Sequence, residues 1–239
     1  MPITDILILS LAALGAATLS AVAGFGGALI LLPILSALLG VKVAIPVLTV
    51  AQFLGNASRV WLGRKELCWK PIVYFLITAV PLSLLGSYTF VKADVAWIKK
   101  FVGMMLIAVA VYRRLYKPVM RFSNKIMWIG GALTGFISGL VGSAGPLGAA
   151  FFLTLNLTKS AYVASEAFTA LVMHAVKTLA YQKWMDIGKN ELYLGLFLGL
   201  IMILGSWIGK RILERLNVKY FTFVVELLLI ASGIKFIVQ

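Results

Sequence analysis

Two short glycine-rich segments stand inside long apolar stretches and are the first candidates for chemistry. Glycine ends a helix at low cost and lets the backbone approach a ligand closely. A helix that restarts inside an apolar stretch exposes N–H groups and the positive end of its dipole, which attract anions. These candidate anion-binding segments are Gly24, Phe25, Gly26 and Gly27, and Gly142, Ser143, Ala144 and Gly145. The alternative is that the glycines only allow helices to pack closely.

Polar residues follow each glycine segment at matching positions. Gln52, Asn56 and Arg59 stand at i, i+4 and i+7, on one face of a helix. His174 and Lys177 lie 118 residues after Asn56 and Arg59 (174 − 56 = 177 − 59 = 118). A charge within an apolar helix is costly and normally faces a cavity or a partner, so these residues are predicted to line an anion route. A snorkelling Arg59 and a structural hydrogen bond from His174 stay open as alternatives.

Two acids lie within apolar stretches and are candidates for carrying a coupling proton. Glu166 and Glu226 would be costly there as isolated charges, and His174 is a third candidate because histidine titrates near neutral pH. The alternative for each acid is an ion pair with a basic residue on another helix. With one cysteine and one histidine in the chain, no metal site and no cofactor are predicted. Motifs such as HExxH and GxSxG are missing, so we expect no enzymatic activity.

The composition indicates that lipid surrounds the elements that carry these residues. Of the 239 residues 62% are hydrophobic and 13% charged, and the mean hydropathy is +1.01, whereas a soluble domain carries about 25% charged residues. The net charge of +14 comes from 22 Lys and Arg against 8 Asp and Glu. The basic residues stand mainly between apolar runs, which is typical of the cytoplasmic side of a membrane protein. We therefore expect the lipid bilayer as a partner and no nucleic acid.

Apolar blocks of spanning length divide the chain into two similar halves. A spanning helix needs about 20 largely apolar residues. The sequence therefore predicts one all-α, polytopic membrane domain with a first repeat at 1–112, a basic cytoplasmic connector at 113–125 and a second repeat at 126–239. The blocks are 6–39, 43–63, 71–91 and 97–112 in the first half and 126–157, 161–184, 192–208 and 220–238 in the second.

The first block of each half is too long for a single crossing. It exceeds 30 residues, roughly 50 Å at ~1.5 Å per residue, against a hydrocarbon core of ~30 Å. We expect each block to be a glycine-broken hairpin, followed by three spanning helices. This arrangement also divides Lys and Arg more unevenly between the two sides than a single crossing does. Each half then crosses an odd number of times, so the sequence predicts inverted repeats with both termini outside.

The chain resembles a known family of membrane proteins. The segment AGFGGA at 23–28, followed by Leu32 and Pro33, resembles the first-half signature of the sulfite exporter TauE/SafE family. The segment GSAGPL at 142–147, with Lys177 and Tyr181 further on, is similar to its second-half pattern. The resemblance implies a transporter of sulfite, sulfonates, sulfoacetate or related small organic anions. Ala28, Ser143 and Ala144 depart from the richer glycine run of the family, which leaves the precise substrate open.

These observations together predict a secondary transporter. A small anion is expected to sit between the two glycine breaks and to be exported by alternating access across the plasma or inner membrane of a bacterium, with proton coupling left open. The alternatives are an anion channel, which uses the same residues, and an accessory membrane subunit that binds no anion. The sequence leaves open whether the chain forms a homodimer.

Overall fold

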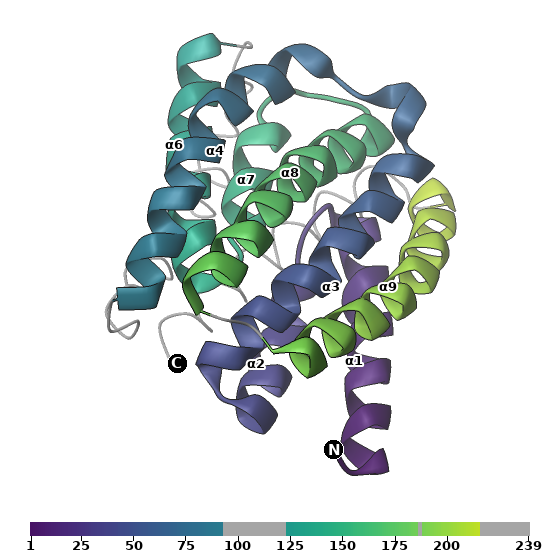
Figure 1. Ribbon diagram of the computed structural model, residues 1–239. Helices are drawn as coiled ribbons and strands as arrows, with labels where there is room; N and C mark the ends of the chain where they lie inside the picture. Colours follow the sequence, from purple (N-terminus) through teal and green to yellow (C-terminus); the bar gives the residue numbers. More distant parts are fainter. Residues whose placement is uncertain (93–122, 186–187, 216–239) are drawn as a thin grey trace.

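The computed structural model describes residues 1–92, 123–185 and 188–215 (Figure 1). All regular structure in these ranges is helical. The predicted blocks 97–112 and 220–238, most of the connector 113–125, and Glu226 lie outside the described residues. The elements are α1 (Ile3–Ala23), α2 (Gly27–Leu39), α3 (Val41–Leu62), a 3-10 turn η1 (Arg64–Glu66), α4 (Trp69–Lys92), α6 (Asn124–Val141), α7 (Gly145–Leu153), α8 (Lys159–Met185) and α9 (Lys189–Arg215).

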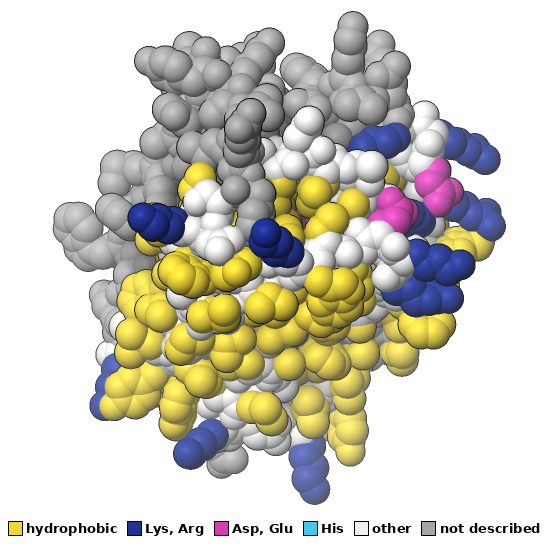
Figure 2. All heavy atoms as spheres, turned by 90° about the horizontal axis from the view of Figure 1, so that it is seen from above, with side chains coloured by type: hydrophobic (Ala, Val, Ile, Leu, Met, Phe, Trp, Pro, Cys, Tyr) yellow, Lys and Arg dark blue, Asp and Glu magenta, His cyan; other side chains and the backbone are white. Residues whose placement is uncertain are grey.

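Four of the described helices are long and apolar enough to cross a membrane: α1, α3, α4 and α9. The large apolar side chains that remain exposed lie mainly on α1, α4 and α9, for example Leu11, Ile77 and Leu200. On the face drawn in Figure 2, hydrophobic side chains form a broad apolar area with Lys and Arg along its edges. Because exposed apolar surface of this extent is costly in water, the described helices form an integral membrane protein.

Each of the two long first blocks is interrupted at its glycines, as predicted. Helix α1 ends at Gly24, which has a φ of 86°, and α2 begins after Gly26, which has a φ of 110°. Helix α6 ends at Gly142 with a φ of 81°, and α7 restarts at Gly145. These positive φ values favour glycine because a Cβ would be strained there. With 13 and 9 residues, α2 and α7 are too short to cross a hydrocarbon core of ~30 Å.

Close glycine contacts fix the relative directions of the helices. Along α4 and α6 the contacts advance together, since Gly131 lies against Phe75 and Gly139 against Ser83. Along α1 and α9, Gly205 meets Leu14 and Gly209 meets Thr18. Glycine allows such backbones to approach closely, and both pairs are therefore parallel.

The two central helices run in opposite directions. Arg59 of α3 pairs with Glu166 of α8, while Gly63, further along α3, lies against Ala164, earlier on α8. Helix α9 runs parallel to α3, and α8 runs parallel to α4. In each pair, residues later in one helix contact residues later in the other. Helices α1, α3 and α9 thus point one way, and α4, α6 and α8 point the other way (Figure 1).

The outer helices of each half of the sequence pack mainly against helices of the other half. Helix α1 of the first half packs against α9 of the second, and α4 of the first half packs against α6 of the second. Helices α3 and α8 contact each other between these pairs. This packing brings the two glycine breaks, more than a hundred residues apart in sequence, to the same small cavity.

Candidate functional site

A small cavity lies between the two helix breaks. Six helices from both halves line it, and the space open to the centre of a water molecule is about 20 Å³, room for roughly one or two waters. Most residues that the sequence proposes for binding or proton transfer are among its lining. They are Phe25, Gly26, Gly27, Gln52, Asn56, Arg59, Ser143, Ala144, Gly145, Glu166 and His174. Gly24, Gly142 and Lys177 are not in contact with the cavity and lie directly behind the breaks.

The carbonyl end of α1 is bound by a buried cation. At the end of a helix the last carbonyl groups have no partner within the helix and carry roughly half a negative charge. The Arg59 Nη1 donates to the Gly24 carbonyl oxygen at 2.6 Å and to the Ser20 carbonyl oxygen at 3.0 Å. The Ser20 oxygen also accepts the Gly24 N–H at 2.8 Å. Arg59 is 6% exposed, so its guanidinium group serves the helix end and does not reach a lipid headgroup.

In the second half, the carbonyl end of α6 is bound in the same way by Lys177 of α8. The Lys177 Nζ donates to the carbonyl oxygens of Gly142, at 2.7 Å, and Ser138, at 3.4 Å, and to the Ser138 Oγ at 2.8 Å. Ser138, Gly142 and Lys177 each lie 118 residues after Ser20, Gly24 and Arg59 (138 − 20 = 142 − 24 = 177 − 59 = 118).

The opposite helix ends at the breaks, the N-termini of α2 and α7, lie at the cavity. Helices α2 and α7 begin there, and neither Gly26 nor Ala144, the residues that precede them, offers a side-chain cap. At α7 the Gly145 N–H donates to the Ser143 Oγ at 3.5 Å, and Pro146 has no N–H, so the free backbone donors are mainly those of α2. Gly27 and Gly145, the first residues of the two helices, line the cavity. Since the negative helix ends are each matched by a cation, the positive N-terminal ends leave the cavity suited to an anion.

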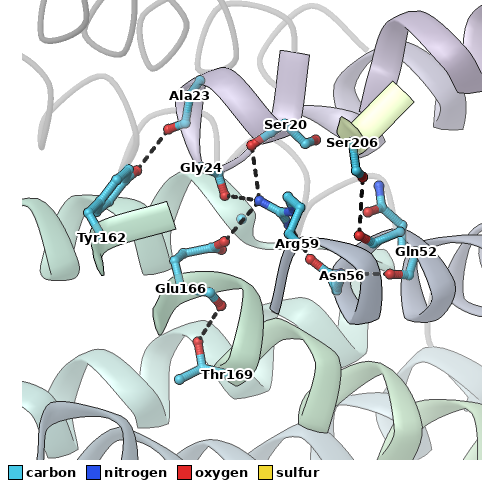
Figure 3. A network of polar contacts seen from close by, with 12 residues as sticks. Ser20, Ala23, Gly24, Gln52, Asn56, Arg59, Tyr162, Glu166, Thr169 and Ser206 are labelled. Atoms are coloured by element: carbon cyan, nitrogen blue, oxygen red, sulfur yellow. Dashed lines mark hydrogen bonds and ion pairs between the residues drawn. The ribbon is translucent and has the colours of Figure 1, made fainter. Parts of the chain in front are cut away.

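Arg59 differs from Lys177 in having further side-chain partners (Figure 3). Its Nη1 lies 3.5 Å from the Glu166 Oε2 and its Nη2 donates to the Asn56 Oδ1. The Asn56 Nδ2 in turn donates to the Gln52 carbonyl oxygen at 2.8 Å. The ion pair of Glu166 with a basic residue on another helix, one of the two interpretations left open by the sequence, is therefore present. Within the described ranges Lys177 has no such acidic partner.

The number of donors on each cation limits what it can offer a ligand. Lysine has three N–H donors and arginine has five. The three contacts of Lys177 match its three donors. The contacts of Arg59 all come from Nη1 and Nη2, so donor capacity remains at a side chain that already lines the cavity.

Two buried polar atoms at the cavity have no hydrogen-bond partner among the described residues. They are the Thr134 Oγ1 and the His174 Nδ1, and both residues line the cavity. The great majority of buried polar atoms in proteins have a partner. Unpartnered polar atoms that face a cavity are therefore available to a ligand, and the structural hydrogen bond considered for His174 is not seen at this nitrogen.

The cavity also contains residues that the sequence had not singled out for binding. Ser20 and Ser138 occupy equivalent positions one turn before the two breaks, and the 118-residue offset was the signal that could have identified them. Thr134 gave no such signal, because Ala16 stands at its equivalent position (134 − 118 = 16). Within the described ranges no three His, Cys, Asp or Glu side chains lie close enough to hold a metal ion.

Comparison with known proteins identifies the family. The family model described as sulfite exporter TauE/SafE matches residues 9–236, nearly the whole chain. Searches of curated proteins and of solved structures each gave no match. The matched range contains both breaks and both buried cations, and the chain therefore belongs to the sulfite exporter TauE/SafE family of membrane transporters.

Proposed function

We propose that this protein is a secondary transporter that carries a small sulfur-containing oxyanion through the cavity between its two helix breaks. The observation that carries the proposal is the pairing of helix ends with charges. Each negative helix end at the breaks is bound by a buried cation, Arg59 or Lys177, and the positive ends face the cavity. A compact oxyanion complements that arrangement because its oxygens accept several hydrogen bonds at once.

The roles of the two cations follow from their donors. Arg59 would contact the anion, since it lines the cavity and has donors to spare. Lys177 would act as a positioning residue that holds the end of α6, because its donors are used by Ser138 and Gly142. The unpartnered groups of Thr134 and His174 would complete the contacts to the anion.

An inverted-repeat mechanism accounts for movement of the anion to both sides of the membrane. Helices α1, α3 and α4 correspond in sequence order to α6, α8 and α9, and each corresponding pair points in opposite directions. Two halves related in this way can exchange conformations and open the cavity to each side in turn. Family membership favours sulfite, with sulfonates and sulfoacetate as larger candidates, and the small cavity favours the most compact of them.

Counterflow in proteoliposomes tests this function. Labelled sulfite outside should enter faster when unlabelled sulfite is loaded inside, and the rate should saturate. Methanesulfonate and sulfoacetate should compete, whereas acetate should compete less. A current that does not saturate and is not stimulated from the far side would identify a channel, and absence of both flux and binding would identify an accessory subunit.

A matched pair of variants tests the site. Arg59→Lys keeps a positive charge but removes the spare donors, so the sulfite concentration for half-maximal counterflow should rise about tenfold or more. Arg64→Lys, an exposed residue on η1 that lies over the Trp61 ring, should leave it unchanged. An unaltered concentration dependence in Arg59→Lys would remove Arg59 from the substrate site.

A further inference from the structure

Among the described residues that line the cavity, Glu166 is the only one with an acidic side chain. Its side chain is 4% exposed and lies 3.5 Å from Arg59. Arg59 comes from α3 and Glu166 from α8, the two antiparallel central helices. The carboxylate therefore lies against the same guanidinium group that would bind the proposed anion.

The elements packed around Glu166 bring one cation to it. Helices α1, α2, α6 and α7 contribute hydroxyl, glycine and apolar residues to the cavity and no titratable side chain. On α8 itself, Tyr162 donates to the Ala23 carbonyl oxygen, while His174 lies two turns further along. Lys177 lies three turns along and is bound to the end of α6, and the charged residues of η1 are exposed at the surface.

Two negative groups cannot share Arg59 at low cost. In surroundings of low dielectric constant, like charges a few ångströms apart repel strongly, and such a pair is relieved when one group takes a proton. Lys177 offers no second cation, because its three donors are in use. An incoming anion is thus either excluded or accompanied by neutralisation of Glu166.

We propose that Glu166 couples transport to protons: one proton binds the Glu166 carboxylate as one anion binds at Arg59, and both are released on the far side. This inference rests on the proposed function of the cavity. In the empty site Arg59 is balanced by ionised Glu166, and in the loaded site by a monovalent anion while Glu166 is neutral. The sum of these charges is zero in both states, so binding of the anion does not change the charge that the low-dielectric interior holds.

The comparison of the two halves supports a single coupling site. The position equivalent to Glu166 in the first half is Leu48 (166 − 118 = 48), which is fully buried in an apolar cluster. The described residues accordingly provide one carboxylate for one anion.

The coupling also has a consequence for the direction of transport, because protons moving inward favour anion entry. Export then requires an inner anion concentration that exceeds the outer one by more than about tenfold per unit of pH difference.

Methanesulfonate in proteoliposomes tests the coupling, since this anion stays ionised and carries no proton of its own. An acidic exterior should drive its accumulation by up to about tenfold per unit of pH difference, and its entry should acidify a trapped pH indicator. If wild-type protein catalyses methanesulfonate counterflow but moves no protons with it, the coupling is wrong and the transport function stands. If counterflow itself is missing, the proposed function fails, and the coupling with it.

A conservative variant assigns the coupling to the carboxylate. Glu166→Gln keeps an oxygen acceptor for Arg59 but cannot exchange a proton at neutral pH, so counterflow should persist while accumulation driven by the pH difference is lost. The control is Glu66→Gln, an exposed acid on η1 that accepts a hydrogen bond from Thr158 at 3.3 Å, which should retain full coupling. Retention of pH-driven accumulation by folded Glu166→Gln would overturn the assignment. The wild-type indicator measurement decides the coupling even if this variant does not fold.

Discussion

The two helix breaks are alike in how they end a helix and different in what surrounds the cation that binds that end. Both end in glycines with φ above 80°, Gly24 and Gly142, and both are held from a helix of the same half by a buried cation. At the first break the cation also contacts Asn56 and Glu166, whereas at the second it contacts only the break and the hydroxyl of the serine one turn earlier.

In our proposal, this difference separates a requirement of the fold from a requirement of function. A helix that ends inside a membrane leaves carbonyl groups that water cannot reach, so each break needs a donor. Lys177 meets this need with its contacts to Ser138 and Gly142. Arg59 meets it with two contacts and has additional donors for Asn56, Glu166 and, in our proposal, the substrate. In our proposal, the cation at the first break therefore has a second role that the cation at the second break lacks.

The largest effect is expected from removing Lys177, the cation to which our proposal gives only a structural role. Lys177→Met keeps an unbranched side chain and removes the charge, so the carbonyl oxygens of Ser138 and Gly142 lose their donor. We expect a loss of about 2–3 kcal/mol in the free energy of unfolding, a melting temperature lower by about 5–10 °C in detergent, and no sulfite flux.

The control for this variant is Lys183→Met, an exposed lysine on the same helix, which should melt as the wild type does. Melting of purified protein with and without sulfite distinguishes the two roles of Lys177. A Lys177→Met protein that melts normally but is no longer stabilised by sulfite would show that Lys177 is a ligand, and the contrast between the two cations would be lost.

A smaller effect on sulfite binding is expected from the room that each break leaves for a side chain at its first helical glycine. Gly27 and Gly145 are equivalent (145 − 27 = 118), but a Cβ on Gly27 would lie 2.6 Å from the Gln52 Nε2 and 2.7 Å from the Ser20 Oγ. A Cβ on Gly145 would lie 3.2 Å from the Phe25 Cβ. Gly27→Ala should therefore weaken sulfite binding about tenfold through displacement of polar side chains, and Gly145→Ala by less than about threefold. The half-saturating concentration in counterflow measures both, and equal losses would contradict the asymmetry.

Sequence reasoning located the breaks and the cations because each has a local signal. Glycines inside an apolar block mark a helix end, and Arg59 and Lys177 share one offset from those glycines. The orientation of Lys177 could not be predicted, since a residue that holds a helix end and one that binds an anion need the same charge at the same depth. The packing of α1 and α4 against helices of the second half could not be predicted either. Glycines such as Gly135 and Gly205 indicate close helix packing but do not identify the partner helix.

The sequence also did not identify Thr134 as a binding residue. A variant of this residue gives the smallest expected effect and tests whether the second half contributes to anion binding. A threonine in an apolar helix usually bonds a carbonyl of its own helix, yet its Oγ1 has no partner among the described residues. Thr134→Val should leave the melting temperature nearly unchanged, because no bond is lost, and weaken sulfite affinity about threefold to fivefold. Thr178→Val, which removes a hydroxyl bonded to the His174 carbonyl oxygen at 2.8 Å, should have the opposite pattern of lower stability and unchanged affinity. If both variants bind sulfite as the wild type does, the Thr134 hydroxyl of the second half does not contact the anion.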